Sequence, residues 1–209
     1  MKRLCAATLW CGIVVFLGSA ALAHAAEWRF PLGLSYIGGL DDVADLYKDN
    51  IDRSTAYTVS DTLTLPVGIA FQPYLEFEGG MGVGMGVGPA QVVLIRGKDG
   101  SPDYSFYNVP VSAELRYSFL PGGGISPYLR GGVLYHIADG DYLESSSVGF
   151  VARAGMELSR KGSRRWGIEV SVDTAELTFT RYSSSSGATR KSSEKIRPLG
   201  FSVSLFIVL

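Results

Sequence analysis

Large apolar side chains alternate with small or charged ones in eight separate segments of the chain, and this period of two restricts its fold more than any other feature. Such alternation is typical of β-strands whose two faces lie in different environments. The segments begin near residues 28, 62, 75, 107, 128, 147, 166 and 199. One face carries the bulky residues and the other carries glycine, serine and charge, as Leu75 to Gly88 shows. We therefore expect an all-β chain of eight strands.

The two faces also indicate which solvent surrounds the strands. A soluble barrel places its large apolar residues inside. In this chain the glycine-rich, charged face is the one that fits inside, because an eight-stranded interior is only just wide enough for side chains to fill. The apolar face is too extensive to lie in water, and a closed sheet satisfies its backbone hydrogen bonds within lipid. The pattern predicts an eight-stranded antiparallel up-and-down transmembrane β-barrel with a filled lumen.

The segments are joined by connections of alternating length. Long connections are expected at 38–60, 89–103 and 181–195, an intermediate one at 138–146, and short turns at 72–73, 120–125 and 160–165. This is the plan of barrels that have short periplasmic turns and longer outer loops. Both chain ends then lie on the periplasmic side. Five aromatic residues of the apolar face lie beside the short turns, as expected of an interfacial girdle: Trp28, Phe71, Tyr117, Phe119 and Trp166.

The first 25 residues have the composition of a secretory signal peptide. Basic Lys2 and Arg3 precede an apolar run from Leu9 to Leu17, and Ala23-His24-Ala25 fits a cleavage site. The alternative, a retained membrane anchor, needs about 20 apolar residues, more than this run supplies. We predict a signal peptide at 1–25 and a barrel domain at 26–209.

Cleavage would leave few chemically reactive side chains. Cys5 and Cys11 are the two cysteines of the chain, and both leave with the signal peptide. The formal net charge changes from −1 to −3 when Lys2 and Arg3 are removed. Nucleic-acid binders carry a basic stripe, so no nucleic-acid partner is expected. No thiol chemistry, cofactor or transition-metal site is expected either.

Together these features resemble the small outer-membrane barrels of Gram-negative bacteria, of the eight-stranded type of the OmpA transmembrane domain and OmpX. The resemblance rests on the signal peptide, the eight alternating segments, the progression "PYLRGGVLYHI … VGFVARAGMEL … WGIEVSVD", and a last segment that alternates up to Leu209. It implies a monomer in the outer membrane that contacts lipid and lipopolysaccharide and is recognised by the barrel-assembly machinery. It also implies a non-enzymatic role in envelope structure or surface recognition. A barrel that binds or conducts a small molecule is the alternative.

A third possibility is a lipid A-modifying hydrolase. The lipid A deacylase family, which this chain resembles in size, uses a His-x-Ser pair on one strand. The corresponding triplet here is His136-Ile137-Ala138, so alanine occupies the position of the nucleophile. A serine needs an adjacent base, and His136 is the only histidine after residue 25. We therefore do not expect an enzyme.

Two groups of charged residues are candidate sites. The inward faces of the strands are expected to hold a lumen cluster of Glu76, Glu78, Glu114, Arg116, Arg130, His136, Arg153, Glu157, Glu169 and Asp173. Such a cluster can act as a gate, a proton relay or a ligand cradle, or it can be a structural ion-pair network, the interpretation favoured in so narrow a barrel.

The second group lies in the first long connection. Leu40, Val43, Tyr47 and Ile51 have helical spacing and predict a short amphipathic helix over the outer mouth. The opposing face carries Asp41, Asp45 and Asp49, which either form a divalent-cation site or are simply a hydrated helix face, the interpretation that we favour.

Overall fold

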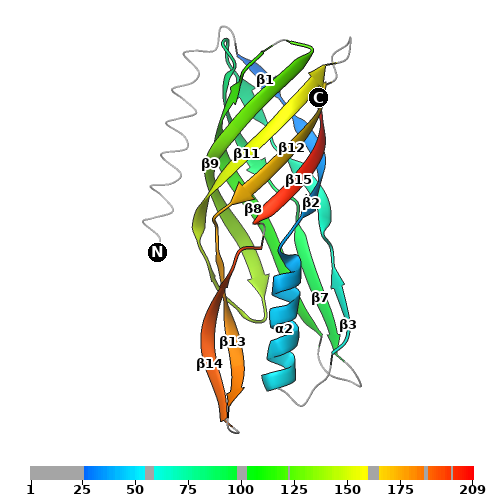
Figure 1. The fold of residues 1–209 in the computed structure, drawn as a ribbon, viewed down its shortest axis with the longest axis vertical. Coiled ribbons are helices and arrows are strands. Elements are labelled where there is room, and N and C mark those ends of the chain that lie inside the picture. Colours follow the sequence, from blue (N-terminus) through cyan, green and yellow to red (C-terminus); the bar gives the residue numbers. More distant parts are fainter. Residues whose placement is uncertain are drawn as a thin grey trace.

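A computed structural model describes residues 26–54, 59–97, 103–121, 123–159, 165–185, 188–198 and 200–209 (Figure 1). The predicted signal peptide at 1–25 lies outside these residues. Within them, eight strands close into an antiparallel barrel in the order β2, β4, β6, β8, β9, β11, β12, β15 and back to β2. Their bounds are Pro31–Ile37, Val67–Phe71, Met81–Val87, Tyr104–Ser118, Ile125–Gly140, Val148–Ser159, Arg165–Asp173 and Phe201–Val208. The predicted eight-stranded barrel is confirmed.

Several shorter strands continue the barrel strands at both ends and so lengthen the barrel wall. At the end where β1 and the chain's last residue lie, β1 (Glu27–Arg29) pairs with β5 (Tyr74–Glu76), and β5 pairs with β6. At the opposite end β3 (Val59–Thr64) pairs with β7 (Gln91–Gly97), which pairs with β8. Pro66, Pro73 and Pro89 lie at the breaks between consecutive pieces, where their missing N–H groups interrupt the ladder.

The expected turn at Gln72-Pro73 is wrong. These residues lie between β4 and β5 on one continuous wall, where Gln72 N donates to Pro31 O at 3.1 Å and Pro73 O accepts from Met85 N at 3.0 Å. The reversal occurs at residues 77–80, where Gly79 and Gly80 have φ of +88° and +84°. The segment Leu75 to Gly88 is therefore a β5–β6 hairpin and not one strand. Four turn residues separate the two strands, so the odd-numbered residues face outward on both and the sequence still alternates as one strand would.

The outer surface of the barrel is apolar around its whole circumference. Leu34, Ile69, Leu115 and Phe150 are 59–70% exposed although they are large and hydrophobic. The five aromatic residues predicted for the girdle are likewise exposed at the end that carries the short turns. This surface fits a hydrocarbon solvent and not water.

The opposite end, which we call the helix end, carries α2 (Leu40–Ser54) and a three-stranded sheet of β10 (Leu143–Ser146), β13 (Leu177–Ser185) and β14 (Ala188–Ile196) (Figure 1). The predicted helix is thus confirmed. The long connections expected at 89–103 and 181–195 consist largely of paired strands, contrary to the loops predicted there. No helix among the described residues is both long and apolar enough to cross a membrane.

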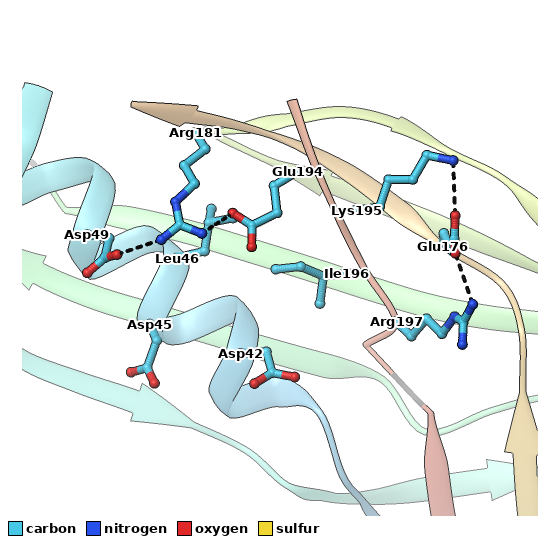
Figure 2. Close-up of a pocket in the computed structure, with 10 residues that line it drawn as sticks. All are labelled: Asp42, Asp45, Leu46, Asp49, Glu176, Arg181, Glu194, Lys195, Ile196 and Arg197. Atoms are coloured by element: carbon cyan, nitrogen blue, oxygen red, sulfur yellow. Dashed lines mark hydrogen bonds and ion pairs between the residues drawn. The ribbon is translucent and has the colours of Figure 1, made fainter. Parts of the chain in front are cut away.

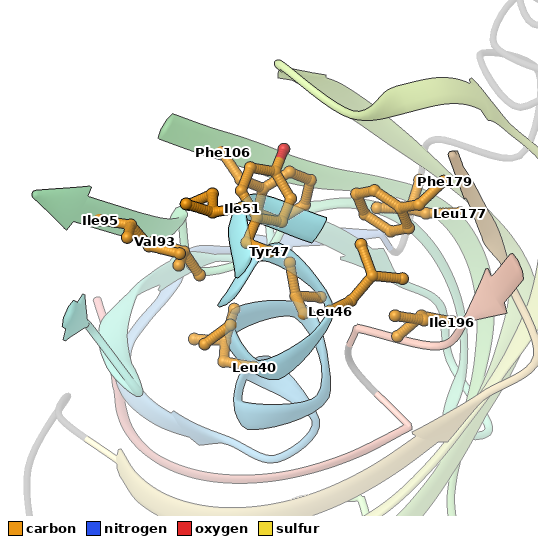
Figure 3. Close-up of a cluster of buried hydrophobic side chains, with 12 residues drawn as sticks. Leu40, Leu46, Tyr47, Ile51, Val93, Ile95, Phe106, Leu177, Phe179 and Ile196 are labelled. Atoms are coloured by element: carbon orange, nitrogen blue, oxygen red, sulfur yellow. The ribbon is translucent and has the colours of Figure 1, made fainter. Parts of the chain in front are cut away.

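The polarity of the wall reverses at the helix end. There the apolar side chains point inward and pack on the buried face of α2, which presents Tyr47 and Ile51 (Figure 3). The inward wall residues of this cluster are Val93, Ile95, Phe106, Leu177, Phe179 and Ile196. Along the barrel the apolar face points outward, as expected in lipid. At the helix end it points inward, as expected in water, because apolar side chains turn away from water.

Candidate functional site

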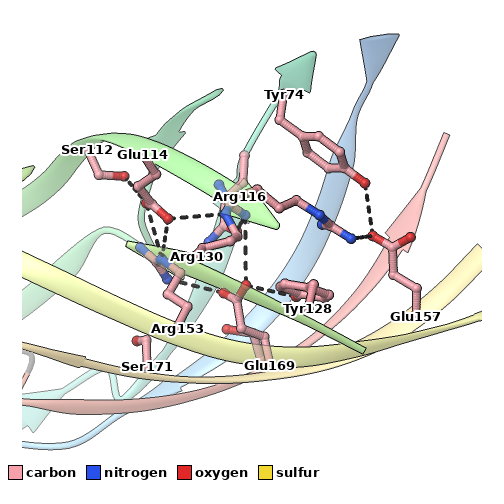
Figure 4. Close-up of polar contacts among 12 residues, drawn as sticks. Tyr74, Ser112, Glu114, Arg116, Tyr128, Arg130, Arg153, Glu157, Glu169 and Ser171 are labelled. Atoms are coloured by element: carbon pink, nitrogen blue, oxygen red, sulfur yellow. Dashed lines mark hydrogen bonds and ion pairs between the residues drawn. The ribbon is translucent and has the colours of Figure 1, made fainter. Parts of the chain in front are cut away.

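The centre of the lumen holds a closed ring of two arginines and two glutamates. Arg130 and Arg153 each contact both Glu114 and Glu169, at N···O distances between 3.0 and 3.7 Å (Figure 4). All four side chains are at least nine-tenths buried. Each charge in the ring has two partners of opposite sign, so the ring is neutral as a unit. We call these four residues the ion ring.

The strand register explains why the ring forms. Arg116, Arg130 and Arg153 are direct neighbours across β8, β9 and β11. Their guanidinium groups would repel one another if the carboxylates did not separate them. Arg130 Nη1 also donates to Gln72 Oε1 at 2.6 Å. Its Nη2 has no hydrogen-bond partner among the described residues, so the ring is paired in charge without being fully satisfied in hydrogen bonds.

A second cluster lies in the lumen beside the ring, around Arg116. Its guanidinium lies between two tyrosine rings, 4.3 Å from the centroid of Tyr74 and 3.8 Å from that of Tyr128. Arg116 and Tyr74 both donate to Glu157 Oε1, at 2.7 and 2.9 Å. Tyr128 donates to Glu169 at 2.8 Å and so joins this cluster to the ion ring. The two clusters therefore occupy adjoining parts of the lumen.

Glycine makes room for these aromatic rings. A Cβ on Gly155 would lie 2.3 Å from the hydroxyl oxygen of Tyr128, and one on Gly167 would lie 2.1 Å from the Phe206 ring. At these two positions the inward glycines therefore accommodate aromatic rings rather than charged side chains.

Three other residues of the predicted lumen cluster lie outside the ion ring. Glu76 pairs with Arg29 at 3.3 Å at the short-turn end. Glu78 lies exposed in the turn at 77–80 and is not in the lumen, because the turn position was misassigned. The Asp173 carboxylate accepts from Ala175 N at 3.1 Å where β12 ends.

His136 is fully buried but stands apart from the ion pairs. Its Nδ1 lies 2.8 and 3.1 Å from the amide nitrogen and oxygen of Asn108, and Asn108 donates to Gln91. Its Nε2 has no hydrogen-bond partner among the described residues. An apolar cluster that contains Ile37, Leu134, Val151 and Ala175 occupies the same half of the lumen.

Sequence reasoning missed Tyr74, Tyr128 and Arg29. Tyr128 shares the inward parity of Arg130, so the alternation could have identified it. Tyr74 was hidden by the misplaced turn at Gln72-Pro73.

Two of the three aspartates considered for a cation site on α2 are paired with basic side chains. Asp45 pairs with Lys48 at 3.3 Å, and Asp49 pairs with Arg53 and Arg181. Within the described residues, no three His, Cys, Asp or Glu side chains lie close enough to hold a metal ion. Asp41 is exposed in the first turn of the helix, where a negative charge stabilises the positive end of the helix dipole.

A cleft of about 520 Å³ lies along one side of the contact between α2 and the β13–β14 hairpin (Figure 2). One wall carries Asp42, Asp45 and Asp49 of the helix. The other carries Arg181, Glu194, Lys195 and Arg197, with Glu176 just before β13. Leu46 and Ile196 are the apolar residues that line it. We call it the α2–β14 cleft.

The paired charges at the helix end predict acid sensitivity. Hydrogen bonds from Lys195 and Arg197 lower the pKa of Glu176, and hydrogen bonds from two hydroxyl groups lower that of Glu144. A lowered pKa gives stability that is present above the ordinary glutamate value of about 4.3 and is lost as pH falls through the lowered value. Hydrogen exchange of β13 and β14, corrected for its intrinsic pH dependence, should show reduced protection in that acidic range. The double variant Glu144→Gln, Glu176→Gln should show a smaller change, and equal changes in both proteins would contradict this assignment.

The chain matches no protein-family model and no curated protein sequence. Its structure is similar to that of the outer membrane protein OprG from Pseudomonas aeruginosa, with a TM-score of 0.59 and 11% identity over 88% of this chain and 94% of that one. Outer membrane protein AlkL aligns over 88% of this chain and 87% of its own, with a TM-score of 0.45 and 14% identity. The E. coli outer membrane protein W aligns over 88% of this chain and 98% of its own, with a TM-score of 0.44 and 15% identity. The similarity to OprG shows that this chain has the fold of the small eight-stranded outer-membrane barrels.

Proposed function

We propose that this chain is a monomeric, non-enzymatic outer-membrane protein whose closed barrel anchors a recognition surface outside the cell. Export by the signal peptide at 1–25 and insertion by the barrel-assembly machinery bring it to a bilayer of lipid and lipopolysaccharide. The apolar circumference and the fold shared with OprG support the location. The helix end, built from α2 and the β10–β13–β14 sheet, then faces outward and supplies the surface.

The observation that carries this proposal is the filled lumen. The ion ring and the Arg116 cluster lie beside each other in the lumen, and the interior of an eight-stranded barrel is only just wide enough for such side chains. The arrangement supports an anchor more strongly than a conduit.

The surroundings of His136 support a non-catalytic role. A hydrolase of the Ser–His type needs a hydroxyl within hydrogen-bond distance of the base. The partner of His136 Nδ1 is the amide of Asn108, and the side chain is fully buried. His136→Ala should therefore leave the acylation of lipid A unchanged in cells that overproduce the protein.

Planar-bilayer recording tests the closed lumen. The purified barrel should give no stable conductance of porin size. The variant Asn50→Ala, which should loosen α2, should be equally silent because the ion ring closes the lumen independently of the helix. Large steady openings in either protein would overturn the proposal.

A further inference from the structure

The charges that line the α2–β14 cleft are not all used by their neighbours. Arg181 bridges Asp49 and Glu194, and this contact connects the two walls (Figure 2). Asp42, on the helix wall, is exposed and has no ion pair with any described residue. Its carboxylate can therefore accept hydrogen bonds from a ligand.

The opposite wall of the cleft has an excess of positive charge. Lys195 and Arg197 share one carboxylate, that of Glu176, at 3.1 and 3.2 Å. An ammonium has three hydrogen-bond donors and a guanidinium has five. Most of these donors are free of Glu176, and the group of three carries a net charge of +1. The cleft thus has a negative site on the helix and a positive site on the hairpin, with Leu46 and Ile196 between its walls.

The cleft lies close to the edge of the apolar surface. Glu176 follows the exposed Val172 by four residues, and Arg197 precedes the exposed Phe201 by four. The cleft therefore begins within a few residues of the apolar surface. Phosphate-bearing headgroups lie at the border of the hydrocarbon core, and an ethanolamine phosphate carries an ammonium and a phosphate on one group.

We propose that the α2–β14 cleft binds a small zwitterion of the ethanolamine phosphate class. The ammonium contacts Asp42, and the phosphate contacts Lys195 and Arg197. This inference deepens the surface recognition proposed above and rests on it. The zwitterion is either a lipid headgroup or a free molecule, because both offer the same two charged groups.

Binding is tested with the full barrel in a non-ionic detergent, since zwitterionic detergents would compete. Titration with O-phosphoethanolamine should be saturable and should shift the amide NMR signals of α2, β13 and β14. Asp42→Asn and Arg197→Gln should each weaken binding at least about tenfold, as expected for the loss of one charge-assisted contact. Asp61→Asn and Arg190→Gln, which alter exposed charges outside the cleft lining, should bind like the unmodified protein.

Partial ligands test the need for both charges. Ethanolamine alone and inorganic phosphate alone should each bind at least tenfold more weakly than the zwitterion. Equal binding of phosphate alone, or equal binding by the Asp42→Asn variant, would overturn the proposal, as would the absence of saturable binding.

A last comparison identifies the source of the ligand. Tighter binding of phosphatidylethanolamine in mixed micelles supports a lipid headgroup, and tighter or equal binding of the free zwitterion supports a soluble molecule. If the barrel conducts ions but still binds the zwitterion, the proposed anchor role is overturned and the binding site is not. If the barrel does not conduct and does not bind the zwitterion, the binding site is overturned and the anchor role is not.

Discussion

Replacing Arg130 with leucine is expected to lower sharply the urea concentration at which the barrel unfolds in lipid bilayers. The change leaves Glu114 and Glu169 with Arg153 as the single remaining cation of the ion ring. An uncompensated buried charge typically costs about 3–5 kcal/mol. The fluorescence of Trp28 and Trp166 follows the transition, and Arg190→Leu makes the same chemical change on the exposed hairpin as a control.

The double variant separates the cost of a stranded charge from the loss of packing. Arg130→Leu combined with Glu114→Leu leaves Arg153 and Glu169, which lie 3.2 Å apart, as a balanced pair. Part of the lost stability should therefore return. If Arg130→Leu unfolds at the same urea concentration as the unmodified protein, the ion ring does not stabilise the barrel. If the double variant is as unstable as the sum of its single changes, the four charges do not act as a unit.

Asn50→Ala is expected to release α2 while the barrel remains folded. The fully buried Asn50 amide binds the backbone of β13 as a neighbouring strand would: Nδ2 donates to Thr180 O at 2.6 Å and Oδ1 accepts from Tyr182 N at 2.8 Å. Each backbone group left without a partner costs roughly 1–3 kcal/mol. The free energy of local opening should therefore fall by roughly 2–6 kcal/mol.

Hydrogen exchange of residues 40–54 and 177–183 measures this opening, and urea unfolding of the barrel provides the comparison. The helix end has its own apolar core, so it can open as a separate unit. Asp52→Ala, on the exposed face of the same helical turn, should leave the exchange of both segments unchanged. Equal exchange in the two variants would show that Asn50 does not hold the helix.

The barrel was predictable because one rule, alternation against lipid, holds along its whole circumference. The same parity predicts that Arg116, Arg130 and Arg153 point inward from neighbouring strands, as they do. It does not predict which carboxylate each arginine meets, because that depends on side-chain direction and on the tyrosines between them. Among the described residues, Arg116 pairs with one carboxylate, that of Glu157, whereas Arg130 and Arg153 each contact two.

The helix end was less predictable because the meaning of alternation changes there. Val93 and Ile95 of β7 alternate as a barrel strand does, yet they point inward to α2. The β13–β14 hairpin is rich in serine and shows hardly any alternation, since most of the described side chains of β14 are exposed to water. Only the spacing of the apolar residues in α2 indicated that a packed element covers this end.

The change from apolar to charged residues on the outer face of the helix end sets how deeply the protein lies in the membrane. On β3 and β7 the last outward apolar residues, Leu63 and Leu94, are register partners, and the next outward positions are Asp61 and Arg96, also register partners. A sinking of one outward position, about 5 Å along the barrel axis, would carry these charges into hydrocarbon. At the short-turn end, Trp28 and Trp166 tolerate both hydrocarbon and headgroups. Differences in membrane thickness should therefore be absorbed at the short-turn end, while the waterline at the helix end stays fixed.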